Sequence, residues 1–589
     1  MYLPKLNILN TTRQMVDEFR GYNHTARIGD GEFFDMRNMT STLYPLASPR
    51  KPRGVFVEAE CNGMVINNGL CYVSGSGLVL VNKDYVDAEL KAGPKTLVSM
   101  GGYVIILPDK KWVNVAAALG KVPGADTSGS IEVDNEYEGG GKVYAAMPDG
   151  RTFPDGEVAS TKPSAPTDGQ YWRDYSVFPA VLKRWYASSG MWVEVSESYA
   201  MIEIDGIGDG LEVGDSVHIT GDFEGALELP EYTQVYWIAD DKSAIVVAGF
   251  VVKHDAHIST EETPIVVQRK IPDMDFVIEC GNRLWGCKYG ETENGFVNEI
   301  YCSKLGDFKN WHSFKGISTD SYVASIGAGG PFTGAVNYNG KPYFFKQDCV
   351  IEVYGSYPAE FQVQTTPCRG VQGGCSKSLA VVGNVLYYKS IDGVCAFDGS
   401  MPSLVSNALG TVRYTDAVGG AFGDKYYLCM NDENGDYQTF VLDTARGMWH
   451  KDEEGPCYTQ ILAHGNMLYA TTDGWDIIVD MLGVTNQTET VEWMLQTGDI
   501  GLNMADAKYI TRLTIRMALD EGSEVSVYCQ YDFDEAWELL CSIPGTSLRS
   551  FNIPIKPKRC DHMRLRIEGV GDARIYSITK TIEQGGERA

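Results

Sequence analysis

One short phrase recurs along this chain and restricts its fold more than any other feature. A small polar turn that contains glycine is followed at once by an apolar and usually aromatic run. Four consecutive turn glycines, Gly340, Gly383, Gly423 and Gly465, are spaced 43, 40 and 42 residues apart. Earlier copies of the phrase begin at Asn67, Met100 and Cys280. Hairpins repeated about every 40 residues are typical of a β-propeller, so the seven copies predict six or seven blades.

The aromatic residues that follow the turns are expected to pack between neighbouring blades, since a single four-stranded blade cannot bury both of its faces alone. A ligand-binding aromatic cage is the alternative. The residues are Tyr343, Phe344, Tyr387, Tyr388, Tyr426, Tyr427 and Tyr469. The chain also has 64 glycines and 33 tyrosines but lacks long helix-forming runs. This balance favours an all-β protein.

The spacing of the phrase also predicts the domain organisation. Gly102 and Gly281 are 179 residues apart, so roughly 140 residues exceed one blade period. Beyond Leu482 the phrase stops, and long strands with period-two alternation follow, which predict a C-terminal β-sandwich. The expected parts are an extended N-terminal arm (1–54), propeller blades (55–120 and 266–483), an inserted small β-barrel or sandwich module (121–265) and the sandwich (484–589).

Charge and cysteine content exclude several classes of protein. Fifty basic and 78 acidic residues give a formal net charge of −28, which disfavours a DNA clamp or a protein that binds anionic membranes. No apolar run is long enough to span a membrane, and the N-terminus lacks a signal-like apolar segment. The 14 cysteines include no CxxC pair, so we expect buried, reduced thiols made in a cytoplasm. Zinc or disulfides are the alternatives.

The usual signatures of catalysis and metal binding are missing from this sequence. There is no HExxH, GxSxG or P-loop, and SIDGV and TTDGW are only fragments of the SxDxGxTW box of propeller glycosidases. A strand would place His254 and His257 on opposite faces. The acidic group of Asp30, Glu32 and Asp35 is more typical of a turn than of a cation site. We therefore predict no enzymatic activity, no cofactor and no metal site.

Four arginines in the C-terminal region alternate along two predicted strands. They are Arg512, Arg516, Arg564 and Arg566. Alternate spacing places each pair on one strand face. A solvated outer face is the simpler interpretation. A subunit interface with an acidic partner, such as a second copy of this chain, is the alternative, and these four residues are our candidates for it.

Two stretches of the sequence resemble virion proteins of tailed phages that infect Gram-positive bacteria. They are residues 21–54 and 489–583. With the blade pattern, the chain resembles the propeller-based nozzle or hub proteins of short-tailed phages. Those proteins begin with a short segment similar to DMRN, which is followed by an R-x-x-R-G-like turn and then by the blades. The matching pieces here are DMRN at 35–38 and PRKPRG at 49–54. The resemblance covers roughly two thirds of the chain and not the insertion.

The resemblance implies a structural virion protein that forms a ring, a hexamer, at the tail axis. It further implies adaptor and tail-fibre proteins as partners, and DNA that leaves through the ring without specific binding. Acidic side chains lining the channel would repel phosphates. A head–tail connector or a receptor-binding adaptor is the alternative within this class. A carbohydrate-binding or carbohydrate-cleaving β-propeller is the alternative from another class.

Overall fold

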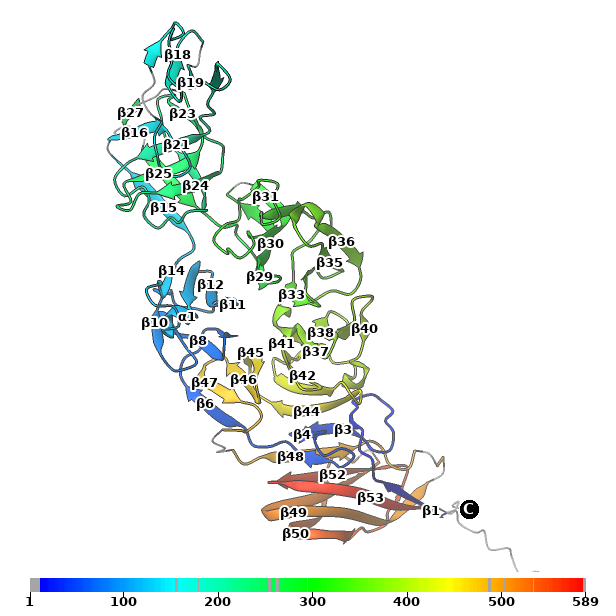
Figure 1. Cartoon of the computed structure of the whole chain (residues 1–589). Coiled ribbons are helices and arrows are strands. Elements are labelled where there is room, and N and C mark those ends of the chain that lie inside the picture. The colour runs from blue at the N-terminus through cyan, green and yellow to red at the C-terminus, as the bar shows by residue number, and fades with distance from the viewer. Residues whose placement is uncertain are drawn as a thin grey trace, which may run out of the picture. The chain divides into compact units, whose positions relative to one another are not determined.

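The computed structural model describes residues 11–585 except 139, 154–156, 178–179, 253–255, 260–263, 294, 486–488, 503, 506 and 533. The chain forms two compact units, which are described separately (Figure 1). The first contains Met1–Leu97, Gly330–Glu352 and Gln364–Ala589, and the second contains Val98–Gly329 and Val353–Val363. No helix among the described residues is long and apolar enough to cross a membrane.

The described residues of the first unit contain five blades of four strands each, one of which is the end of a thirteen-stranded sheet. In four of these blades the strands follow one another in chain order. These four are β7 (Met64–Ile66), β8 (Leu70–Ser74), β9 (Gly77–Val79) and β10 (Tyr85–Asp87); β33 (Gly334–Tyr338), β34 (Lys341–Phe345), β35 (Cys349–Tyr354) and β36 (Gln362–Pro367); β37 (Ala380–Val382), β38 (Val385–Ser390), β39 (Gly393–Phe397) and β40 (Ser403–Leu404); β41 (Thr415–Phe422), β42 (Lys425–Asn431), β43 (Tyr437–Asp443) and β44 (Met448–Glu454).

The last blade is completed by a strand from the N-terminal part of the chain. Its first three strands are β45 (Tyr458–His464), β46 (Met467–Thr472) and β47 (Trp475–Asp480). The fourth is β6 (Gly54–Glu58), which pairs antiparallel with β47 so that Gly54 lies opposite Asp480 and Val57 opposite Ile478. Two distant segments of the chain are therefore joined in one sheet, which protects the edge of β47.

The second unit contains two further blades, so the described residues contain seven propeller blades. They are β11 (Thr96–Met100), β12 (Tyr103–Leu107), β13 (Lys111–Asn114) and β14 (Ser128–Ser130); and β29 (Phe276–Glu279), β30 (Leu284–Thr292), β31 (Gly295–Cys302) and β32 (Tyr322–Ser325). The sequence prediction of six or seven blades is confirmed by this arrangement.

The repeated turn has the same place in each blade, as the sequence pattern predicts. Gly340, Gly383, Gly423 and Gly465 all lie in the two-residue loop between the first two strands of successive blades. Each has a positive φ, between 57° and 73°. Two-residue hairpin loops need such backbone angles, which glycine adopts without a steric penalty.

Aromatic side chains pack between neighbouring blades of the first unit, as expected from the sequence. The ring centroids of Phe345 and Tyr388 are 5.2 Å apart, and Tyr387 stacks on Tyr426 at 5.4 Å. All four side chains are buried. The prediction that these residues form core rather than an open ligand cage agrees with these contacts.

A long sheet region follows the propeller and includes strands from the N-terminal segment. It contains β48 (Glu492–Thr497), β49 (Lys508–Tyr531), β50 (Glu538–Ile553), β51 (Arg559–Cys560), β52 (Met563–Val570) and β53 (Ala573–Gln584). β1 (Thr11–Val16) pairs with β53, β3 (Glu32–Arg37) pairs with β48, and β2 (Gly21–Tyr22) pairs with β3 and β44. From Thr11 onward the predicted N-terminal arm is thus built into this sheet, because Phe19, Phe33 and Met36 are buried in its core.

The C-terminal strands show the alternation expected of a sandwich. Leu513, Ile515 and Met517 of β49 are fully buried, whereas Arg512 and Arg516 are exposed. A second stretch of β49, which begins at Val525, alternates in the same way. The two stretches pair with β53 and β52 respectively, and β50 runs beside both.

The insertion is an eight-stranded sheet region with its own core between β14 and β29. Its strand order is β15 (Val133–Tyr137), β28 (Ile265–Arg269), β22 (Ser216–Thr220), β24 (Thr233–Ile238), β25 (Ala244–Ala248), β21 (Tyr199–Glu203), β16 (Gly140–Ala145) and β27 (Ala256–Ser259). A smaller sheet contains β17 (Glu157–Ala159), β18 (Tyr171–Asp174), β19 (Val181–Tyr186) and β20 (Met191–Glu194). The core includes Val143, Ile202 and Val247.

The strand pairing shifts both ends of the predicted insertion, 121–265. β14 pairs with β13 as the fourth strand of a blade, so the residues before Ile131 belong to the propeller. β28 pairs with β15, which extends the module to Arg269. The Gly- and Ser-rich composition from Gly124 indicated a loop, and residues 124–127 lie outside any strand. Ser128–Ser130 instead add their backbone to a blade edge, where side-chain type matters little.

Candidate functional site

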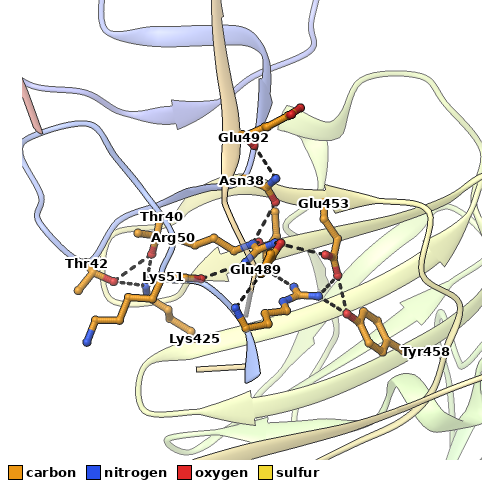
Figure 2. Close-up of polar contacts among 12 residues, drawn as sticks. Asn38, Thr40, Thr42, Arg50, Lys51, Lys425, Glu453, Tyr458, Glu489 and Glu492 are labelled. Carbon is orange, nitrogen blue, oxygen red and sulfur yellow. Dashed lines mark hydrogen bonds and ion pairs between the residues drawn. The ribbon is translucent and has the colours of Figure 1, made fainter. Parts of the chain in front are cut away.

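The R-x-x-R-G segment lies at a buried cluster of charged side chains in the first unit (Figure 2). The side chains of Arg50 and Arg53 are only 8% and 7% exposed. Arg50 Nε lies 2.8 Å from Asp452 Oδ1, and Arg53 Nη2 donates to Asp452 Oδ2 at 2.7 Å. One carboxylate thus faces both arginines, and the two guanidinium groups are held in fixed positions.

Two further carboxylates complete this arginine cluster. Glu489 accepts from Arg50 Nη1 and Nη2 at 2.9 and 2.8 Å, which is the bidentate geometry of a strong arginine–carboxylate pair. The same carboxylate accepts from the backbone N–H of Arg53 at 2.8 Å. Glu453 pairs with Arg53 and accepts from the Tyr458 hydroxyl at 2.5 Å.

The cluster joins three parts of the first unit. Arg53 directly precedes β6, which completes the last blade, and Tyr458 begins β45 of the same blade. Asp452 and Glu453 belong to β44 of the preceding blade. Glu489 precedes β48 of the sheet region that contains β48–β53, β1 and β3, which is called the terminal sheet below. Arg50 and Arg53 therefore fix the closing strand to two blades and to the terminal sheet.

The charges of the arginine cluster stabilise one another despite their burial. Burial acts to lower the pKa of Arg50, but Glu489 and Asp452 raise it above its ordinary value overall. Burial acts to raise the pKa of Glu489, but its hydrogen bonds from Arg50 and Arg53 hold it below its ordinary value. Arg50 and Glu489 thus stay ionised at neutral pH, which suits a structural brace rather than an acid–base catalyst.

The first unit also contains a groove of about 340 Å³. It is lined by Tyr22, His24, Asp35, Tyr414, Asp432, Glu433 and Lys451, among others. Burial, followed by neighbouring charges that include Asp35, raises the pKa of Tyr22 and Tyr414, so both phenols remain neutral hydrogen-bond donors. Tyr22 and Tyr414 are buried, so their rings shape the groove wall, and the carboxylates and Lys451 supply groups that could hydrogen-bond a sugar.

Two carboxylates of the groove, Asp432 and Asp35, already have partners within the chain. Asp432 accepts from the backbone N–H groups of Asn434 and Asp436 at 2.9 and 3.0 Å. Asp35 lies 3.6 Å from Lys451 Nζ. These contacts fix the carboxylates, so the groove is a preformed polar surface.

The structure separates the acidic residues that the sequence grouped together. Glu32 accepts from the backbone N–H of Gly29 at 2.6 Å, Asp30 pairs with Lys580, and Asp35 faces the groove. Among the residues whose placement is given, no group of three or more His, Cys, Asp or Glu could hold a metal ion. His254 lies outside the described residues, and His257 belongs to β27.

The four arginines proposed as an interface lie in two places. Arg512 and Arg516 are exposed on the part of β49 that pairs with β53. Arg564 and Arg566 belong to β52, beside the later part of β49. Arg564 Nε lies 2.5 Å from Asp499, and Arg566 pairs with Glu568. Arg512 Nη2 donates to Asn552 Oδ1 at 3.3 Å. The interface role stays a prediction for these residues, and three of them already have partners within the chain.

The sequence pattern did not indicate a stacked group of rings in the second unit. Tyr232 of the inserted module lies parallel to His312, which follows β31, with ring centroids 3.9 Å apart. The ring centroids of Tyr232 and His218, which belongs to β22, are 5.5 Å apart. Beside them, Asn310 accepts from the Ser216 backbone N–H at 2.7 Å. The module is thus fixed to this blade by aromatic and polar contacts.

Burial, with a smaller effect from His218, lowers the pKa of His312 to about 4. Between this value and the ordinary histidine pKa the unfolded chain binds more protons, so stability falls as the pH falls. We expect His312→Phe, which keeps the stacking on Tyr232, to reduce the loss of unfolding free energy between pH 7 and pH 4 by up to about 3 kcal/mol. Urea unfolding at both pH values measures this, and an unchanged pH dependence would contradict it.

No family model and no curated protein matches this chain. Several solved structures are similar to it. They include an exo-β-1,3-galactanase from Phanerochaete chrysosporium (9% identity, TM-score 0.21, 52% of this chain and 94% of that chain), an acylaminoacyl peptidase from Pyrococcus horikoshii (12%, 0.24, 60% and 56%) and the endosialidase of phage phi92 (11%, 0.20, 78% and 63%).

The comparisons correct one prediction from the sequence. We predicted that the chain is not an enzyme, and the glycoside hydrolases among the similar structures contradict that prediction. The prediction rested on missing motifs, but glycosidases act through two carboxylates that no fixed local motif needs to mark. At these identities and TM-scores the similar structures assign no substrate and no catalytic residue to this chain.

Proposed function

We propose that this chain is a structural protein of a tailed-phage virion whose copies form a ring at the tail axis, a nozzle or hub through which DNA leaves. The observation that supports this most is the place of the R-x-x-R-G segment, the motif on which the resemblance partly rests. Arg50 and Arg53 join the closing strand β6, two blades and the terminal sheet. A motif with this bracing role stabilises the fold and performs no chemistry, which agrees with the structural role that the resemblance implies.

The mechanical demands of a conduit agree with this arrangement. A ring wall that surrounds moving DNA needs subunits that do not open at their sheet edges. β6 closes the last blade, and β1 and β3 tie the N-terminal segment into the terminal sheet. Each of these links joins segments that are distant in sequence, so the first unit resists unfolding from either end.

The charge of the chain suits a channel along which DNA slides. A formal net charge of −28 repels phosphates, so contacts that would hold the DNA are few. We propose that the channel wall is acidic and that arginines gather at subunit contacts or on the outer wall. The partners proposed with this role are adaptor and tail-fibre proteins, and six copies form the ring. A head–tail connector or a receptor-binding adaptor is the alternative within the same class.

Labelling the protein in intact virions tests the proposed location. Antibodies raised against the purified chain should bind at the tail, on its axis, and cryo-electron microscopy of the tail should show density for a seven-bladed propeller around the axial channel. Antibody binding only at the head–tail junction would favour the connector. A protein that is absent from the virion would contradict every phage role proposed here.

The groove lined by Tyr22, Asp35, Tyr414 and Asp432 supports a second candidate function, carbohydrate binding or cleavage. An oligosaccharide panel, with calorimetry for binding and chromatography for cleavage, tests it. Tyr414→Ala should weaken binding at least tenfold, because the groove loses the buried ring that shapes its wall, whereas Tyr85→Ala, on an exposed strand of another blade, should not. No binding and no cleavage of any member would exclude this candidate for the glycans tested.

A further inference from the structure

The terminal sheet has two open edges. Four of its strands run in the order β50, β49, β53 and β1, and each neighbouring pair is antiparallel. Within the described part of the chain, β50 pairs only with β49, and β1 pairs only with β53. Each outer strand therefore presents a row of backbone N–H and C=O groups without a strand partner.

The two edges carry little of the usual protection against pairing: β50 contains Pro544, but this residue lies before the stretch 546–553, and each edge stretch carries one arginine. Edge strands are commonly blocked by lysine, proline or a covering segment. Residues 546–553 of β50 read TSLRSFNI, and β1 reads TTRQMV, so both lack lysine and proline. Ser547, Leu548, Arg549 and Ser550 are all exposed, and Met15 of β1 is 62% exposed. Such edges favour the addition of another strand.

We propose that β50 of one copy pairs with β1 of the next copy, and that this strand addition joins the subunits of the ring. The inference rests on the proposed function, which requires a ring. A ring needs a head-to-tail contact between two different surfaces of each subunit. β50 and β1 are two different surfaces, and they are opposite ends of one sheet, as such a contact requires.

The strand directions also fit this contact. With β49 and β53 between the two edge strands, and each neighbouring pair antiparallel, β1 and β50 run in opposite directions. A neighbour in the same orientation then adds its β50 antiparallel to β1, which continues the sheet pattern. The two edges also lie at the same level of the sheet, because Val16 lies opposite Ile578, Ile578 opposite Ile515 and Ile515 opposite Phe551.

The width of the sheet makes a disulfide test decisive. Three spacings of about 4.8 Å separate β1 from β50 in one chain, about 14 Å in total. Cysteines can form a disulfide only when their Cα atoms are within about 7 Å. A disulfide between a cysteine on β1 and a cysteine on residues 546–553 must therefore join two different copies.

The first test uses full-length chains that carry Met15→Cys together with Ser547→Cys, Ser550→Cys or Asn552→Cys, oxidised at low protein concentration. At least one pair should give a ladder of linked chains that ends at the size of the closed ring. Each single variant should give no ladder, which controls for the native cysteines. A ladder that stops at two chains would favour pairing of β50 with another β50 and would overturn the proposal.

The second test adds a charge to the open edge. Leu548→Lys should reduce the ring fraction at least tenfold by light scattering, whereas Ile391→Lys, in an exposed turn between β38 and β39 of a blade, should leave it unchanged. A wild-type ring that Leu548→Lys leaves intact would overturn the strand addition alone. A wild-type chain that stays monomeric up to high concentration would contradict the proposed ring function, and the strand addition with it.

Discussion

Arg53→Ala is expected to lower the free energy of unfolding of the first unit by about 3–5 kcal/mol. The substitution removes the guanidinium group that pairs with both Asp452 and Glu453, and it leaves Arg50 as the one remaining arginine beside these two buried carboxylates. Their side chains are only 6% and 12% exposed, so water cannot replace the guanidinium. Urea unfolding followed by tryptophan fluorescence measures the change.

Arg369→Ala is the matched control for this substitution. Arg369 Nε contacts Asp392 at 2.7 Å, but both side chains are about half exposed, 51% and 53%. Exposed pairs of this kind contribute about 0.2–1 kcal/mol. A loss in Arg53→Ala no larger than in the control would show that the arginine cluster does not brace the first unit.

The double substitution Val55→Pro and Val57→Pro is expected to detach β6 from β47. Proline has no backbone N–H and cannot donate to the strand ladder. Each lost hydrogen bond costs about 0.5–1.5 kcal/mol, and the partly buried Val57 side chain also loses its packing. Hydrogen exchange should show that amides of β46 and β47 lose protection, whereas those of β49 keep it.

Val55→Thr with Val57→Thr keeps both N–H groups and should retain protection in β47, so it controls for the loss of the valine side chains. Protection of β47 that survives the double proline substitution would contradict the closing role of β6. The same result would also contradict the bracing role of the arginine cluster, because that role is to hold β6 against the last blade.

The local part of the fold follows directly from the sequence. The turn glycines and the aromatic strands after them identify the blade hairpins, because a hairpin is formed by neighbouring residues. The strand that completes the last blade is different. β6 pairs with β47 across more than 400 residues, and no local pattern marks GVFVE as the missing strand.

The arginine cluster shows the same limit at the level of side chains. The R-x-x-R-G segment is visible in the sequence, but the carboxylates that face Arg53 and Arg50 are 399 and 439 residues away along the chain. Asp452 and Glu453 lie in the run KDEEG, which is typical of a solvated turn. Only the pairing of β6 and β48 with distant strands brings these residues together.

The central claim is that copies of this chain close into a ring with an open axis. Electron microscopy of the purified full-length protein, with two-dimensional class averages, tests it most directly. The account predicts rings with a single number of subunits and a channel at the centre, formed at physiological salt. Class averages that contain only single subunits, or open chains of varying length, would contradict it.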